Sequence, residues 1–415
     1  MHSRSRTAPL WLAVWLIAPA GPAAAQVVTN LYNFGGTPTD GIYPDGSLTQ
    51  IGGTLYGATE QGGINNSNGT IFKIGPSGAG YLTMYSFGAD PAEGRGGTGA
   101  LVAVGSTLYG LTLLGGTGNG GTVYKINADN TGYTVLHRFT GGANDGFRPQ
   151  GALLVVGGVL YGTTDQGGSA NGGTVFRMNP DGTGFQVIHS FSGGPNDGRG
   201  PVGTLVTDGS TLYGMSNAGG AANGGTIFKL NLEGSGFGII HSFTGGANDG
   251  QYPAGSLTLV GSTLHGMTPQ GGSVNLGVAF RVGTDGSAFA LAHSFGGPPG
   301  DGSSPDGGFT GVGSELYGLT ATGGSAALGT LFGIGTDGSG YNSMYSFKGF
   351  PNDGANPLGD PLYLNGALYG MTQVGGSQAE GVVFSFPIPV PEPSSFYLVA
   401  AAAAGILSAR RRKKQ

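Results

Sequence analysis

Six aspartates recur at one position of a repeating pattern, and glycine directly follows each of them. They are Asp40, Asp145, Asp197, Asp249, Asp301 and Asp353, with Glu93 in the seventh place. Such a pair typically forms a turn in which the carboxylate accepts hydrogen bonds from N–H groups of its own loop. The alternative is a rim of carboxylates that binds Ca²⁺ or sugar hydroxyls. Because a calcium site needs roughly six to eight oxygens, we favour the turn. We keep the six aspartates as a candidate binding rim and predict no metal there.

Four histidines occupy a second repeated position, where tyrosine stands in other repeats. They are His137, His189, His241 and His293, and the tyrosines are Tyr32, Tyr85 and Tyr345. Metal ligands must lie about 2 Å from one shared ion, whereas equivalent positions of successive repeats lie a whole unit apart. The exchange of histidine with tyrosine predicts an aromatic side chain whose polar tip forms a hydrogen bond between units. We therefore predict no catalytic residue and no cofactor from this series.

The chain contains no motif of a familiar catalytic site. Residues 94–99 and 116–121 match the glycine spacing of a phosphate-binding loop, but neither segment opens a helix. With 90 glycines among 415 residues, chance matches are expected. The chain also has no cysteine, which excludes disulfides and thiolate sites. Two carboxylates from different repeats could still meet across a central channel, and this keeps an enzymatic alternative open.

Three sequence markers recur seven times each, which indicates a tandem repeat of about 52 residues. The Leu-Tyr-Gly triplet, or a close variant, begins at Leu55, Leu108, Leu160, Leu212, Leu264, Leu316 and Leu368. The aromatic residue of a Gly-Thr-Val-Phe-like segment stands at Phe72, Tyr124, Phe176, Phe228, Phe280, Phe332 and Phe384. A phenylalanine that ends another segment stands at Phe34, Phe87, Phe139, Phe191, Phe243, Phe295 and Phe347.

Each repeat contains four short apolar runs separated by glycine-rich turns. In one unit the runs are 151–156, 159–164, 174–178 and 185–191. Alternation in the last run predicts that Phe185, Val187, His189 and Phe191 lie on one face of a strand. Four short strands without helical periodicity are typical of a β-propeller blade, so the fold class is all-β with one seven-bladed propeller over residues 26–387.

The two ends of the repeat array complement each other. Residues 28–34 resemble the fourth run of a unit without the first three, and the last unit lacks its fourth run after Phe384. We predict that the N-terminal strand completes the last blade, because a closed ring removes exposed sheet edges. An open β-solenoid would not require such complementary ends.

The repeat resembles a named family, the GloVer tandem repeats of surface-anchored bacterial proteins. The resemblance lies in Leu160 to Gly168, Asn171 to Phe176 and His189 to Phe191, and it extends over residues 31–386. It implies a surface protein with no assigned chemistry. Kelch propeller blades are similar in shape, but the tryptophan of a kelch blade is missing from every unit.

Residues 1–25 have the pattern of a secretory signal peptide. Arg4 and Arg6 precede a short apolar core, and small residues end at Ala25. We therefore expect signal peptidase to cut between Ala25 and Gln26. The apolar core is too short to favour an uncleaved membrane anchor.

Residues 388–415 form a second targeting segment. Pro391, Glu392 and Pro393 precede an apolar stretch, and a basic cluster follows. This order resembles the PEP-CTERM sorting tails of Gram-negative bacteria, in which the Pro-Glu-Pro triplet is recognised by an exosortase, a membrane processing enzyme. The resemblance implies transient anchoring in the inner membrane by an apolar helix. A plain C-terminal membrane anchor is the alternative.

Charge excludes one class of partner. Without the seven basic residues of the two ends and without Glu392 of the tail, 10 basic residues remain against 21 acidic ones, so we expect no nucleic-acid binding. We expect an exported protein of the cell surface, outer envelope or extracellular matrix. Its leading function is non-catalytic binding of exopolysaccharide or protein. The alternative is a secreted carbohydrate-active hydrolase or lyase with its site at a channel mouth, and ice or mineral contact is a weaker third idea.

Overall fold

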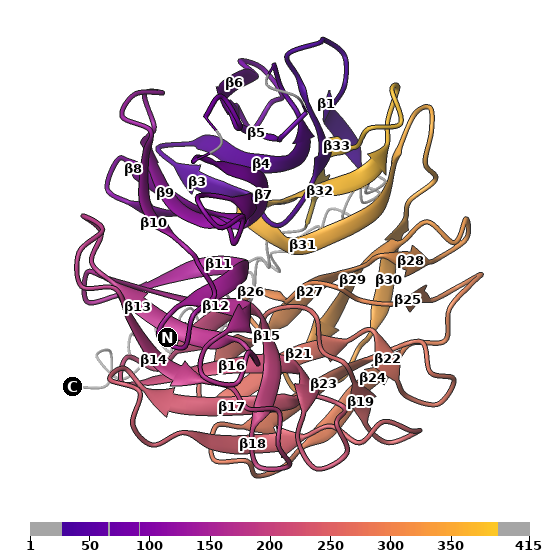
Figure 1. The fold of residues 1–415 in the computed structure, drawn as a ribbon. Helices are drawn as coiled ribbons and strands as arrows, with labels where there is room; N and C mark the ends of the chain where they lie inside the picture. Colours follow the sequence, from indigo (N-terminus) through magenta and orange to yellow (C-terminus); the bar gives the residue numbers. More distant parts are fainter. Residues whose placement is uncertain (1–26, 65–66, 91, 389–415) are drawn as a thin grey trace, which may run out of the picture.

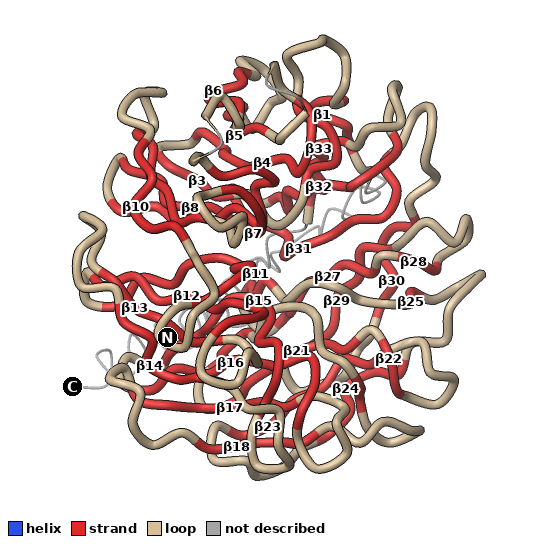
Figure 2. Tube along the Cα trace, in the orientation of Figure 1, coloured by secondary structure: helices blue, strands red, loops and turns tan. Residues whose placement is uncertain are grey.

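The chain folds into a closed ring of seven four-stranded blades (Figure 1). The structure is a computed structural model that describes residues 27–64, 67–90 and 92–388. All regular elements of these residues are strands, joined by turns and loops (Figure 2). The predicted seven-bladed β-propeller is therefore confirmed.

Each blade is an antiparallel sheet whose strands follow one another from the ring axis outward. Blade one contains β2 (Gly41–Pro44), β3 (Thr49–Ile51), β4 (Thr54–Gly62), β5 (Thr70–Ile74) and β6 (Leu82–Ser86). Blade two contains β7 (Gly94–Val104), β8 (Thr107–Gly115), β9 (Thr122–Asn127) and β10 (Thr134–Arg138). Blade three contains β11 (Gly146–Val156), β12 (Val159–Gly167), β13 (Thr174–Met178) and β14 (Gln186–Ser190). The fourth contains β15 (Gly198–Thr207), β16 (Thr211–Gly219), β17 (Thr226–Asn231) and β18 (Gly238–Ser242).

The inner strands of blades five and six are interrupted, as is that of blade one. Blade five contains β19 (Gly250–Gln251), β20 (Thr258–Val260), β21 (Thr263–Thr268), β22 (Gln270–Gly271), β23 (Val278–Gly283) and β24 (Ala290–Ser294). Blade six contains β25 (Gly302–Ser303), β26 (Thr310–Val312), β27 (Glu315–Thr320), β28 (Thr322–Gly323), β29 (Thr330–Gly335) and β30 (Asn342–Ser346). Blade seven contains β31 (Gly354–Leu364), β32 (Ala367–Gly375), β33 (Val382–Pro387) and, as its outer strand, β1 (Thr29–Asn33).

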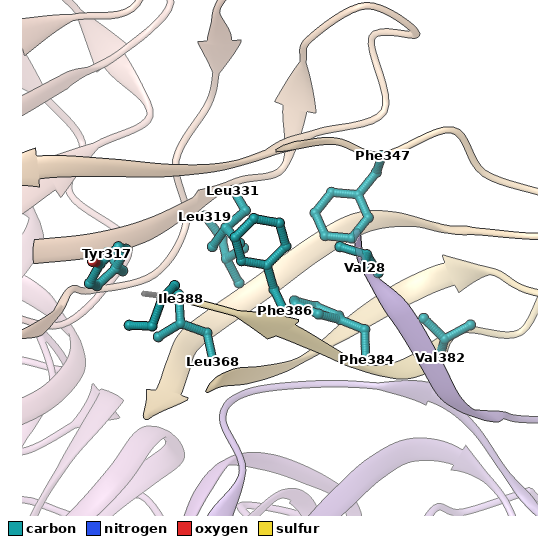
Figure 3. Close-up of a cluster of buried hydrophobic side chains, with 10 residues drawn as sticks. All are labelled: Val28, Tyr317, Leu319, Leu331, Phe347, Leu368, Val382, Phe384, Phe386 and Ile388. Carbon is teal, nitrogen blue, oxygen red and sulfur yellow. The ribbon is translucent and has the colours of Figure 1, made fainter. Parts of the chain in front are cut away.

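The N-terminal strand closes the ring, as predicted. β1 pairs antiparallel with β33, with Thr29 opposite Ser385 and Asn33 opposite Val382. Figure 3 shows the buried cluster at this seam, where Val28 packs among Phe384, Phe386 and side chains of blade six. Because β33 thereby gains a partner, the last blade has the same four strands as the others.

Burial between the blades explains two of the repeated sequence markers. The described residues form seven buried apolar clusters, and each spans one pair of neighbouring blades. Within a blade, the glycine of the Leu-Tyr-Gly triplet lies opposite the marker aromatic, as Gly162 does opposite Phe176. A Cβ atom at Gly162 would lie 2.5 Å from the Phe176 ring, so only glycine leaves room for this ring.

The prediction that Phe185, Val187, His189 and Phe191 all lie on one face of the fourth strand is wrong. Phe185 packs against blade two, whereas His189 and Phe191 contact Phe237 of blade four. The cause is a β-bulge, because Val175 pairs with His189 while the next residue pairs with Val187. One extra residue in a strand reverses the side to which the following side chains point.

Both ends of the ring lie at the same face. The N–H of Ile388 donates to the carbonyl of Gly366, 2.9 Å away, in the turn between β31 and β32. Val28 and Ile388 share one buried cluster. The inner strands run toward this face, so their first residues lie at the opposite face of the propeller.

Candidate functional site

The repeated aspartates are anchored inside their own loops. Both oxygens of Asp145 accept hydrogen bonds: Oδ1 from His137 Nε2 at 2.9 Å and from the N–H of Gly146 at 2.8 Å, and Oδ2 from the N–H and hydroxyl of Thr140. Comparable bonds hold Asp197, Asp249 and Asp301, while Asp40 and Asp353 accept from tyrosine hydroxyls and backbone N–H groups. The turn alternative therefore describes the contacts of all six.

These contacts change the acidity of the carboxyl groups. Partial burial raises the pKa of Asp145, but the hydrogen bonds from His137 and Thr140 together outweigh burial and hold this pKa below its usual value. The same balance lowers the pKa of Asp197, Asp249 and Asp301. These four carboxyl groups are therefore ionised at neutral pH.

The repeated histidines join neighbouring blades through their ring faces. His137 lies on Phe185 of the next blade, with ring centroids 3.8 Å apart and an interplanar angle of 8°. Six blade interfaces carry such a stacked pair, with centroid distances between 3.6 and 3.8 Å. The predicted hydrogen bond from the polar tip is present, but it reaches the aspartate of the linking loop, and the ring face makes the contact between blades.

The candidate rim residues are therefore structural in every described contact. Asp40, Asp249 and Asp353 are buried, and the other three are partly buried. A ligand at this rim would have to replace hydrogen bonds that already hold the loops. Rim binding stays a prediction.

The inner strands line an axial cavity of about 770 Å³ to which all seven blades contribute. At its waist stands one glycine from each blade, and the backbone of each packs against the next. They are Gly46, Gly99, Gly151, Gly203, Gly255, Gly307 and Gly359. A Cβ atom on any of them would lie between 1.9 and 2.4 Å from the following glycine of the ring, and Gly359 meets Gly46. We call this set the glycine ring.

Side-chain oxygens just past the glycine ring link neighbouring blades. The hydroxyl of Thr204 accepts from the N–H of Ala152 at 3.1 Å, and Ser256 accepts from Thr204 at 3.0 Å. In the same layer, Asp360 accepts from the N–H of Gly308 at 2.5 Å. Burial raises the pKa of Asp360 and this hydrogen bond opposes the rise. Asp360 therefore replaces a hydroxyl as the acceptor between two blades.

Two further carboxylates, Asp45 and Asp306, face the cavity from the layer before the glycine ring. The equivalent residues in the other blades are Thr98, Gln150, Val202, Ala254 and Leu358. Burial raises the pKa of Asp45 to about 6, with the negative charges of Glu60 and Asp306 adding to the rise. Removal from bulk water alone raises the pKa of Asp306 to about 6. The Asp306 side chain is exposed and borders the cavity, whereas that of Asp45 is half-buried.

Sequence reasoning did not single out these two aspartates. Asp45 and Asp306 lie 261 residues apart, although each stands in a Pro-Asp-Gly tripeptide, at residues 44–46 and 305–307. A signal was nevertheless present, because aligning the seven repeats on their ring glycines places an acidic residue in this layer only in units one and six. These two acidic residues depart from the repeat symmetry, because the other five units have a neutral residue at this position.

Several sequence predictions concern residues outside the described ranges. These are the signal peptide with Ala25 and Gln26, and the sorting motif of Pro391, Glu392 and Pro393. Within residues 27–64, 67–90 and 92–388, no helix has the length and apolar character needed to cross a membrane. In those same ranges, no group of three or more His, Cys, Asp or Glu side chains is arranged to hold a metal ion.

Comparison with known proteins identifies one sequence family and several proteins of similar structure. The Gloeobacter/Verrucomicrobia repeat matches residues 20–140, 91–280 and 247–400. No curated protein matches the sequence. An oligogalacturonate lyase in complex with manganese is similar in structure, with a TM-score of 0.53 at 10% identity, covering 88% of this chain and 97% of that one. The oligogalacturonate lyase of Vibrio parahaemolyticus gives a TM-score of 0.51 at 10% identity, with 88% and 98% covered. At such identities the likeness shows the fold alone.

Proposed function

Because this chain belongs to the Gloeobacter/Verrucomicrobia repeat family, we propose that it is an exported repeat protein of the cell surface or extracellular matrix. Its role is non-catalytic binding of exopolysaccharide or of a surface protein. Signal peptidase removes residues 1–25, and an exosortase-type enzyme processes the tail at Pro391, Glu392 and Pro393.

The placement of the two ends of the ring carries this proposal. Val28 and Ile388 leave the ring at one face. Asp45 and Asp306 precede the glycine ring and so belong to the opposite side. A protein held by its C-terminal segment would therefore present the side of its cavity that carries Asp45 and Asp306 outward. The repeated aspartates and histidines support a non-catalytic role, because internal contacts already engage them.

A glycan array probed with residues 26–389, which include the whole ring, tests the binding function. We expect retention of a narrow set of polysaccharides without chain cleavage. Repeated turnover of any retained polysaccharide, seen as new reducing ends or unsaturated products, would contradict the non-catalytic proposal. Fractionation of cells carrying the full chain or a Pro391→Ala, Glu392→Ala, Pro393→Ala variant tests the localisation.

One observation favours a second candidate, a secreted carbohydrate-active hydrolase or lyase. Asp45 and Asp306 face one cavity from different blades, and both have a pKa raised to about 6. Carboxyl groups with raised pKa values are suited to general acid–base catalysis near neutral pH. In this case Asp306→Asn would abolish turnover while retaining binding.

A further inference from the structure

We propose that a polar pocket between blades three and four binds one neutral sugar residue of a glycan through its hydroxyl groups. The side chains that would contact these hydroxyls are Asp165, Asn171, Arg199 and Asn217. The inference rests on the proposed function and deepens it, because it names the ligand class and the site of the binding module.

The pocket lies on the face of the propeller opposite the two ends of the ring. Asp165 stands near the end of β12, Arg199 and Gly200 stand at the start of β15, and Asn217 stands near the end of β16. The volume of the pocket is about 250 Å³. Pockets that enclose drug-sized ligands measure roughly 300–1,000 Å³, so this one suits a single sugar residue whose chain continues into solvent.

The absence of a side chain at Gly200 keeps the pocket open. Each unit has one residue three positions before its member of the glycine ring, and all seven have a φ between 51° and 67° and donate their N–H to a loop of the preceding blade. They are Tyr43, Gly96, Arg148, Gly200, Tyr252, Ser304 and Asn356. A Cβ atom at Gly200 would lie 2.9 Å from Oδ1 of Asp165, so a side chain there would cover this carboxylate.

Opposite charges line the pocket without pairing. Asp165 is half-buried and Arg199 is exposed, and neither takes part in any ion pair of the described part of the chain. Within the same residues, the side chain of Asp165 accepts one hydrogen bond, from Nε2 of Gln166 at 3.4 Å. A ligand with a single charge would meet a like charge here as well as an opposite one. The pocket therefore favours a neutral ligand that both donates and accepts hydrogen bonds.

Two asparagine side chains beside these charges are already held in position. Oδ1 of Asn171 accepts from the N–H of Gly167 at 2.9 Å, and Nδ2 of Asn217 donates to the carbonyl of Pro253 at 3.2 Å. These bonds leave Nδ2 of Asn171 as a donor and Oδ1 of Asn217 as an acceptor for a ligand. Because both amides are fixed in advance, binding would order few side chains.

Neighbouring sugar hydroxyls match this set of donors and acceptors. Each hydroxyl donates one hydrogen bond and accepts others, so it can donate to Asp165 or Asn217 while it accepts from Arg199 or Asn171. A uronic acid would bring a second negative charge close to Asp165, and an amino sugar would bring a positive charge close to Arg199. A zwitterionic amino acid would also balance both charges, and the experiment therefore includes one.

A glycan array and isothermal titration calorimetry at pH 7 test the proposal on the purified chain. The array carries neutral, acidic and amino glycans, and the calorimetric probes are maltotetraose, cellotetraose, mannotetraose and L-alanine. Asp165→Asn removes the charge of the carboxylate at nearly constant shape. Gly200→Tyr fills the pocket with the side chain that unit five has at this position, Tyr252.

The repeat supplies a matched control for each variant. Glu60→Gln changes the equivalent of Asp165 in unit one, where Leu113 of the next blade takes the place of Asn217 and Arg95 donates to Asn119. Ser304→Tyr makes the change of Gly200→Tyr in unit six, away from the pocket. Circular dichroism and urea unfolding establish that each variant is folded. If Gly200→Tyr does not fold, Asp165→Asn decides.

We expect neutral glycans to be retained and each pocket variant to weaken their binding by about tenfold or more, as loss of a charge-assisted hydrogen bond predicts. Both controls should bind like the original chain. Retention of acidic or amino glycans alone would overturn the assignment of a neutral ligand. Binding of L-alanine that Asp165→Asn abolishes would overturn the assignment of a sugar. An equal loss in Glu60→Gln would overturn the assignment of this pocket.

The same experiment separates this inference from the proposed function. If neutral glycans are retained and neither pocket variant weakens them, the binding function stands and this pocket is not its site. If Asp165→Asn abolishes binding of a glycan that the original chain cleaves, the site stands and the non-catalytic function is wrong.

Discussion

Replacing a residue of the glycine ring with alanine should destabilise the propeller far more than the same change at an equally unusual backbone position. Gly203 has a φ of +65°, and a Cβ atom there would lie 2.2 Å from the carbonyl oxygen of Gly255. Gly157, in the turn between β11 and β12, has a φ of +58° and no atom within 4 Å of its Cβ position. Both variants therefore place alanine at a positive φ, but only Gly203→Ala also brings a Cβ atom into overlap with a neighbouring strand.

The expected magnitudes follow from this geometry. At both sites, placing alanine in the left-handed region lowers the free energy of unfolding by about 1–2 kcal/mol. Alanine also restricts the unfolded chain, and this restores about 0.4–1 kcal/mol. At Gly203 the overlap adds about 1–3 kcal/mol, as forced insertion into a packed region does. We therefore expect Gly203→Ala to lose about 2–4 kcal/mol of unfolding free energy, and Gly157→Ala to lose about 1 kcal/mol.

Equilibrium urea unfolding followed by tyrosine fluorescence measures both variants. Gly255→Ala is a useful third, because its backbone is not in the left-handed region while its Cβ would lie 2.1 Å from Gly307. Its loss should come from overlap alone. If Gly203→Ala and Gly157→Ala lose equal stability, the inner strands are not packed backbone to backbone, and the description of the axial waist is wrong.

Three further predictions follow. Thr29→Cys together with Ser385→Cys should form a disulfide across the closure of the ring and stabilise it by about 2–5 kcal/mol; failure to cross-link under oxidation, measured by mass spectrometry, would contradict the pairing of β1 with β33. His189→Tyr should retain the stacked contact and the bond to the loop carboxylate, while His189→Ala should lose about 1–3 kcal/mol in urea unfolding; equal losses would refute the role of the ring. The pKa of Asp45 and of Asp306 in the folded state lies above the ordinary value of 3.8, so the folded state binds more protons than the unfolded state between about pH 4 and 6. The contribution of these two groups to the free energy of unfolding therefore falls as pH rises through this window. The Asp45→Asn, Asp306→Asn double variant should show a weaker fall, and a pH profile of stability equal to that of the original chain would rule out the raised pKa values.

The blade architecture was predictable because it repeats. Seven occurrences of each marker reveal strand order, blade number and closure, since the apolar runs and glycine turns that encode one blade also encode the next. Local departures were not predictable. The bulge at Val187 and His189 adds one residue to β14, and nothing in the alternation of side chains signals it. Likewise, β11 begins at Gly146, five residues before the apolar run, because pairing with β12 extends across polar residues.

The sequence alone determined that this protein is a closed ring of seven similar sheets, because short-range patterns of apolar residues and glycine specify each blade and the unmatched ends specify their joining. Only the tertiary structure decided which polar groups could act. It engaged the conspicuous aspartates and histidines in loop and interface contacts, and it brought Asp45 and Asp306 to one cavity. The physical reason is ring closure, which makes residues from the first and sixth repeats face the same axis.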